Sequence, residues 1–138
     1  MNTPPFISLQ SSLIVLRVVT PLLFMAHAVV RIINDTVPQF ASFLGSYGFP
    51  QPLLLVWAIT AVEIVAGTLM IAGVKVRCMA AALACIAFGG IVIIHARLGW
   101  FVGEHGTGGS EYSVCLLLCL LVIAAAAVPE RRRDSTVR

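Results

Sequence analysis

The chain has 138 residues, of which 59% are hydrophobic and 11% are charged. A soluble domain carries about 25% charged residues, so this composition excludes an ordinary water-soluble protein and indicates an integral membrane protein. The length suits a single domain covering residues 1–138. The net charge of +3 does not indicate a nucleic-acid-binding protein, because four of the nine basic residues lie after residue 130.

Four apolar stretches predict transmembrane helices. They cover about residues 12–33, 53–73, 76–98 and 111–128. Each is close to the roughly 20 residues that a helix needs to cross a bilayer core. None alternates in polarity at every second residue, as a membrane-spanning strand does. We therefore predict an all-α fold, a bundle of four transmembrane helices.

The first stretch carries polar residues along one edge. His27 and Arg31 are four residues apart and share a helix face, and Arg17 lies within about 40° of the same direction. A cleaved signal peptide would begin with a basic segment and would not hold Arg17 inside its apolar part. A spanning helix is therefore the better interpretation of this stretch.

The connector that follows, residues 34–51, contains an amphipathic segment. Gly48 and Pro50 end the segment before the second stretch. We predict a short helix at the membrane interface, with its aromatic rings directed toward the acyl chains. Its apolar residues recur at spacings near 3.6 and are Val37, Phe40, Phe43, Leu44 and Tyr47.

Glu63 lies at the centre of the second stretch. Inserting a carboxylate at that depth costs roughly 2.5–3.5 kcal/mol, so an ionisable residue there indicates a functional site. Thr60, Ala66 and Gly67 share its helix face and are small or polar, which is typical of a face that packs against other helices.

The third stretch has a stripe of small residues, Ala81, Cys85 and Gly89, which predicts a helix contact. By helical angle, His95 points within about 40° of the direction of Ala81, the first residue of the stripe. Glu111 and Tyr112 open the fourth stretch. The histidines and Glu63 do not have the close spacing of metal ligands, so we predict no metal.

Depth along each span places these polar groups in one half of the bundle. Arg31, His95 and Glu111 each lie about 12 Å from the midpoint of their span, His27 lies about 6 Å from it, and Glu63 lies at it. An alternative that remains open is purely structural, with Arg31 and Glu111 forming an ion pair between the first and fourth helices. The candidate proton-carrying catalytic residues are Glu63, His95 and Glu111, and the candidate ligand-binding residues are Arg17, His27, Arg31 and Tyr112.

Basic residues predict the orientation. Lys75 and Arg77 flank the link between the second and third stretches, and the arginine-rich tail follows the fourth. The segments 34–51 and 99–110 contain no Lys or Arg. The positive-inside rule therefore predicts an inner-membrane protein with both termini in the cytoplasm.

Several short motifs occur in a fixed order along the chain. They are Leu16-Arg17, His27 to Arg31, Gly48-Phe49-Pro50, Glu63 to Leu69, Gly73 with Arg77, His95 with Gly99-Trp100-Phe101, and Gly108-Gly109 with Glu111-Tyr112. In this order they resemble the DoxX family of small four-helix membrane proteins. The chain departs from the family pattern in having Ala28 for a glycine, Arg31 for a lysine and Ala66 for a glycine.

The family takes its name from membrane subunits of a thiosulfate:quinone oxidoreductase, so the resemblance implies a quinone-linked redox role. A quinone head group needs donors to its carbonyl oxygens and a proton supply, and Arg, His, Tyr and Glu supply both. A redox partner protein or a second copy of the chain would then complete the system. The alternatives are a non-enzymatic accessory or assembly protein with a structural polar layer, and a small proton-coupled transporter; whether the chain is an enzyme stays open.

Overall fold

The computed structural model describes residues 6–94, 99–101 and 109–127. These residues form helices and no strand, which confirms the prediction of an all-α fold. The helices are α1 (Leu9–Ile33), α2 (Val37–Ser46), α3 (Pro52–Ile71), α4 (Val76–Ile93) and α5 (Glu111–Ala126).

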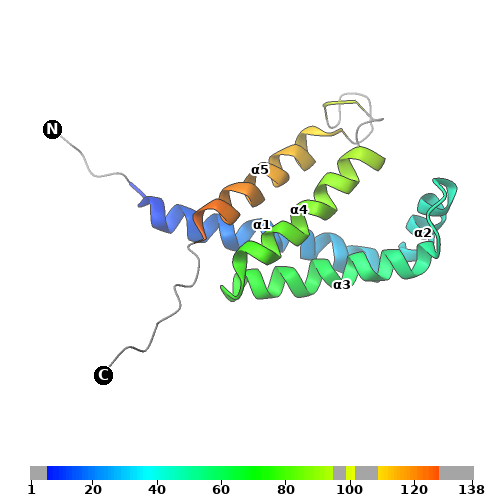
Figure 1. Ribbon diagram of the computed structural model, residues 1–138, viewed down its shortest axis with the longest axis horizontal. Helices are drawn as coiled ribbons and strands as arrows, with labels where there is room; N and C mark the ends of the chain where they lie inside the picture. Colours follow the sequence, from blue (N-terminus) through cyan, green and yellow to red (C-terminus); the bar gives the residue numbers. More distant parts are fainter. Residues whose placement is uncertain (1–5, 95–98, 102–108, 128–138) are drawn as a thin grey trace, which may run out of the picture.

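The long helices form two antiparallel pairs (Figure 1). One pair is α1 with α3 and the other is α4 with α5, and α3 also contacts α4. The short helix α2 packs on α3, and α4 and α5 lean away from α1 and α3 toward the α2 end (Figure 1). The start of α1 and the end of α5 lie at the opposite end from α2.

Three of the described helices are long and apolar enough to cross a membrane: α1, α3 and α4. Helix α5 is also apolar but has 16 residues. The four predicted stretches thus correspond to α1, α3, α4 and α5, and the last residues of the predicted third stretch, 95–98, lie outside the described residues. By composition and helix length this is a membrane protein.

The face of α3 that carries Glu63 is buried, as the sequence predicts. Thr60, Glu63, Ala66 and Gly67 all belong to its buried residues. Gly67 permits a close approach of α1, because a Cβ atom there would lie 2.7 Å from Cγ of Met25. Small residues of this kind let the backbones of membrane helices come together.

The main core lies where α1, α3, α4 and α5 meet. On α4 the core residues are Ala80, Leu83 and Ala87, whereas Ala81 and Cys85 of the predicted small-residue stripe are exposed. The prediction that this stripe is the helix contact is therefore wrong: small residues permit close approach, but the larger Leu83 gains more contact by facing the core. The full core cluster is Phe24, Ala66, Met70, Ala80, Leu83, Ala87, Leu116, Leu120 and Ile123.

Helix α2 is present where the sequence predicts it, but its apolar face packs on protein. Val37, Ala41 and Leu44 form a second buried cluster with Val56 of α3. Of the aromatic rings that were expected to point toward acyl chains, those of Phe40 and Phe43 pack against this cluster, so the expectation is wrong for these two residues. Tyr47, at the end of α2, is exposed.

Two glycine-containing motifs meet at the start of α5. The Ser110 amide donates to the Gly99 carbonyl at 3.1 Å, and the Glu111 amide donates to the Trp100 carbonyl at 3.0 Å. A Cβ atom on Gly109 would lie 2.6 Å from the carbonyl oxygen of Phe101 and closer still to that of Trp100. Only glycine fits there. The contact holds the start of α5, and with it Tyr112, next to residues 99–101.

Candidate functional site

The polar centre of the molecule is an ion pair between α1 and α3. Nη1 of Arg31 donates to Oε2 of Glu63 at 2.9 Å. The side chains are 15% and 5% exposed, respectively, so the pair is almost entirely covered by protein. A buried carboxylate needs such a partner, because an unpaired charge in an apolar medium is costly.

Thr60 extends this pair into a hydrogen-bonded chain. The same Nη1 of Arg31 donates to Oγ1 of Thr60 at 2.7 Å, and Oγ1 donates to the Val56 carbonyl at 2.8 Å. Thr60 and Glu63 are three residues apart and therefore neighbours on the helix surface. One guanidinium nitrogen bridges both.

Arg31 also connects α2 to the pair. Its Cζ atom lies 5.2 Å from the ring centroid of Phe40, within the range of a cation–π contact. Its main-chain carbonyl accepts hydrogen bonds from the Thr36 amide at 3.0 Å and from Oγ1 of Thr36 at 3.3 Å. The role of Phe40 was missed at the sequence level, where the ring was expected to face acyl chains, and no spacing in the sequence signals this contact.

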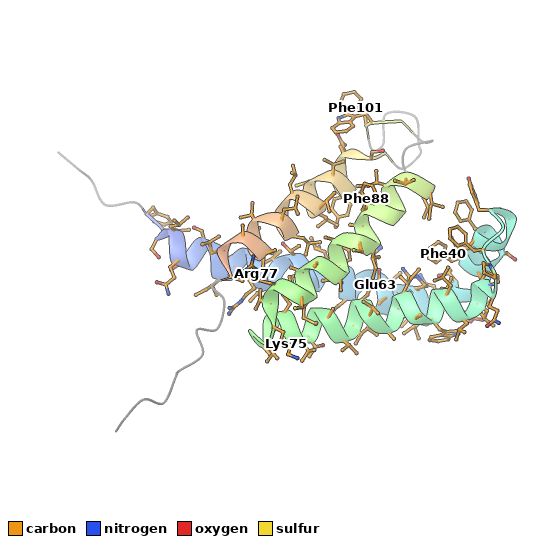
Figure 2. The ribbon with its side chains drawn as sticks, viewed as in Figure 1. Phe40, Glu63, Lys75, Arg77, Phe88 and Phe101 are labelled. Atoms are coloured by element: carbon orange, nitrogen blue, oxygen red, sulfur yellow. The ribbon has the colours of Figure 1, made fainter. Side chains whose placement is uncertain are left out.

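A cleft of about 520 Å³ opens between the two helix pairs, beside the ion pair. Figure 2 shows Glu63 between α3 and α4, with Phe40 on the α2 side of the same space. All five helices contribute to its walls. The lining residues with polar side chains other than cysteine are His27, Arg31, Glu63, Tyr112 and Ser113. The apolar walls include Phe24, Leu44, Leu55, Ile59, Ile86, Ile93 and Leu116.

A second hollow of about 450 Å³ also borders Arg31. It shares His27, Arg31 and Phe40 with the cleft and adds Thr36 and Gln39 from the α2 region. His27, Arg31 and Phe40 therefore border both an apolar cleft and a more polar hollow.

Four of the candidate site residues come together at the cleft: Glu63, His27, Arg31 and Tyr112. His27 and Tyr112 are exposed. Glu111 is half-buried in the first turn of α5 and is not among the residues that line the cleft. His95 lies outside the described residues.

Arg17 lies far from this group. It lines a separate pocket at the opposite end of the bundle, where its Nη1 would be 3.6 Å from a Cβ atom on Gly73. Arg17 shares a helix direction with Arg31, but fourteen residues of helix separate them by about 21 Å.

The ion pair that the structure shows for Arg31 is with Glu63, and not with Glu111 as in the structural alternative. Depth estimated from main-chain position put Arg31 about 12 Å from the layer of Glu63. The long arginine side chain spans this difference in main-chain depth, because it extends along the helix axis to reach Glu63.

This arrangement has the chemistry to hold a polar group inside an apolar cleft. Arg31 donates hydrogen bonds without losing its charge, whereas Glu63 and His27 can each take up or release a proton. Among the residues that the structure describes, no three His, Cys, Asp or Glu side chains are grouped as metal ligands.

The sequence model of the DoxX family matches residues 12–96, more than half of the chain. The chain belongs to the DoxX family. No curated protein and no solved structure matches it. The matched region of this DoxX family member contains Arg31, Thr60 and Glu63, whereas α5, with Glu111 and Tyr112, follows it.

Proposed function

We propose that this DoxX family member is a quinone-linked redox component of the inner membrane. The observation that carries the proposal is the buried Arg31–Glu63 pair at the wall of an otherwise largely apolar cleft. A quinone has a flat apolar ring with carbonyl oxygens at its edges, and it reaches a membrane protein laterally through the bilayer.

The cleft fits such a ligand in size and lining. Its volume of about 520 Å³ lies within the roughly 300–1,000 Å³ of small-molecule sites, which are mostly apolar with a few convergent polar groups. Arg31, His27 and Tyr112 can donate hydrogen bonds to carbonyl oxygens, and Ile59, Ile93 and Leu116 offer surfaces for the ring or its tail.

Each polar residue has a separate part in this proposal. A quinone, when bound, takes up two electrons and two protons to become a quinol. Arg31 orients the head group while it remains paired with Glu63. Glu63 and His27 hold and pass on protons, and His27 borders the more polar hollow through which protons can enter. The electrons come from a separate donor protein.

The membrane placement belongs to the same proposal. Helices α1, α3, α4 and the shorter α5 span the inner membrane, and α2 lies near one interface. Lys75 and Arg77 lie at the end opposite α2, together with the start of α1 and the end of α5 (Figure 2). The positive-inside rule assigns that end, and both termini, to the cytoplasm.

Quinone binding by purified protein tests the proposal. Quinones extracted from the purified sample are identified by chromatography, and a short-chain quinone is then titrated into the protein in detergent. We expect saturable binding. Absence of copurified quinone together with no binding on titration would refute a quinone site.

A pair of α4 variants links binding to the cleft. A Cβ atom on Gly89 meets no atom of the described residues within 4 Å, so Gly89→Leu should fold and place its side chain in the cleft. We expect quinone affinity to fall about tenfold or more, because the added side chain would overfill the cleft once the ligand is bound. Ala81→Leu adds a similar side chain at an exposed α4 position that does not line the cleft, and should bind as the unaltered protein does.

A non-enzymatic accessory or assembly role is the second candidate. It is favoured by the way Arg31 joins α1, α2 and α3, which is a structural function in its own right. This role predicts that Gly89→Leu supports growth and partner assembly as well as Ala81→Leu does. A selective cellular defect of Gly89→Leu at equal protein abundance favours the quinone site instead.

A further inference from the structure

A second pocket, with different chemistry, lies at the end of the bundle opposite α2. It measures about 520 Å³ and is bounded by the start of α1, the α3–α4 turn, the start of α4 and the end of α5. Lys75 and Arg77 are at this end in Figure 2. Among the described residues, none lines both this pocket and the cleft beside Glu63.

Three cationic side chains from different segments line this pocket: Arg17 of α1, Lys75 of the turn and Arg77 of α4. No Asp or Glu is among its described lining residues. Like charges repel each other, so three cations gathered among these described residues favour binding of an anion. Gln10 of α1 adds a neutral hydrogen-bond donor.

The start of α4 strengthens the positive character of the pocket. Lys75 is the N-cap of α4, and in the described part of the chain no side chain caps this helix end. The next residues, Val76, Arg77 and Cys78, also line the pocket. The first N–H groups of a helix have no partner within the helix and carry the positive end of its dipole, which favours phosphate and carboxylate ligands.

Arg17 is half-buried and lines this pocket. Its Nε atom is buried and has no hydrogen-bond partner among the described residues. Buried donors in folded proteins are nearly always satisfied. The guanidinium lies beside the turn at Gly73, whose φ of 80° is readily adopted by glycine, and a Cβ atom there would make ordinary van der Waals contact with Nη1 of Arg17 at 3.6 Å.

We propose that this pocket binds the phosphate of an anionic phospholipid. Arg17, Lys75 and Arg77 contact the phosphate, and the apolar side chains of Leu13, Ile14 and Ile123 contact the glycerol and upper acyl chains. This combination of cations and apolar walls selects a lipid over a free anion. Basic pockets between transmembrane helices bind lipid head groups in this manner.

The test is lipid binding by the full-length protein in detergent, followed by native mass spectrometry. Phosphatidylglycerol, phosphatidylcholine and inorganic phosphate are titrated separately. We expect phosphatidylglycerol to bind more tightly than phosphatidylcholine and inorganic phosphate not to displace it at millimolar concentration. Displacement by inorganic phosphate, or equal binding of the two lipids, would overturn the assignment to an anionic lipid.

Two charge-matched variants locate the site. Lys75 and Arg77 are exposed, so K75Q/R77Q should fold. Each lost basic residue should weaken phosphatidylglycerol binding about fivefold, giving about 25-fold together. The control R132Q/R133Q removes the same charge from the tail, outside the described residues, and should leave binding unchanged.

A third variant tests the arginine that carries the unsatisfied donor. Arg17→Lys keeps the charge but removes Nε and the planar fork, and we expect it to weaken phosphatidylglycerol binding without affecting quinone binding at the distant cleft.

If K75Q/R77Q binds phosphatidylglycerol normally, or if R132Q/R133Q loses binding equally, the lipid is held elsewhere and the proposal is wrong. Neither result bears on the quinone site.

Discussion

Arg31 of α1 and Glu63 of α3 form an ion pair of 2.9 Å that is covered on nearly all sides by protein. The pair lies at the junction of three helices, since Phe40 of α2 covers the guanidinium and Thr60 of α3 shares its hydrogen bonds. It also forms part of the wall of the largely apolar cleft. The pair therefore contributes to the stability of the bundle, and it would contact a ligand that enters the cleft.

The ion pair should show strong coupling in a double-mutant cycle. Arg31→Gln leaves a buried carboxylate without its partner and Glu63→Gln leaves a buried guanidinium, so each should lower the free energy of unfolding by about 3–5 kcal/mol. The double variant R31Q/E63Q leaves neither charge and should be more stable than either single variant. Reversible unfolding in detergent measures all four proteins, and additive losses would contradict a direct pair.

Thr60→Val tests the hydrogen bond that Thr60 receives from Arg31. Valine has nearly the same shape, so the loss of about 1 kcal/mol in unfolding free energy reflects the missing interhelical bond. Thr68→Val is the matched control, because Oγ1 of Thr68 donates to its own helix at Ile64, 2.8 Å away, and the residue is exposed. Equal losses for the two variants would show that only the bond within the helix matters.

Phe40→Leu should loosen α2 from the rest of the bundle. Leucine keeps the apolar contact but removes the ring face over Arg31, a contribution of roughly 0.5–2 kcal/mol. Hydrogen exchange of the α2 amides should become faster. Phe40→Trp has a stronger ring face and should retain the protection, whereas identical exchange in both variants would argue against a cation–π contact.

Gly109→Ala should destabilise the start of α5. The added methyl group would collide with main-chain oxygen atoms of Trp100 and Phe101, which cannot rotate away, so we expect a loss of about 1–3 kcal/mol in unfolding free energy. Gly89→Ala is the control. Its Cβ atom meets nothing within 4 Å, so it should be neutral or gain up to about 1 kcal/mol from better helix propensity.

The proposed orientation predicts the behaviour of reporter fusions. A fluorescent protein that folds only in the cytoplasm should be active when fused after Arg138 or inserted at Lys75. Alkaline phosphatase, which is active only outside the cytoplasm, should be active when inserted after Asn34. The reverse pattern would show that the bundle is inverted in the membrane.

Much of the candidate site could be predicted from local sequence patterns. The helical period places Thr60, Ala66 and Gly67 on the face of Glu63, and that face is buried in the structure. Apolar length gave the positions of α1, α3 and α4 and the apolar character of α5, because backbone hydrogen bonds must be satisfied within each segment in lipid.

The contacts between segments were not encoded in any local pattern. The sequence placed Arg17 and Arg31 on one helix edge, but the tertiary structure assigns them to two pockets with different chemistry. It also decided that Arg31 pairs with Glu63 and is covered by Phe40. Composition and periodicity thus determined by themselves that this is an all-helical membrane protein with a buried carboxylate. Only the tertiary structure decided the partner of that carboxylate, because partners depend on helix tilt, axial register and side-chain reach, which arise when separate helices pack together.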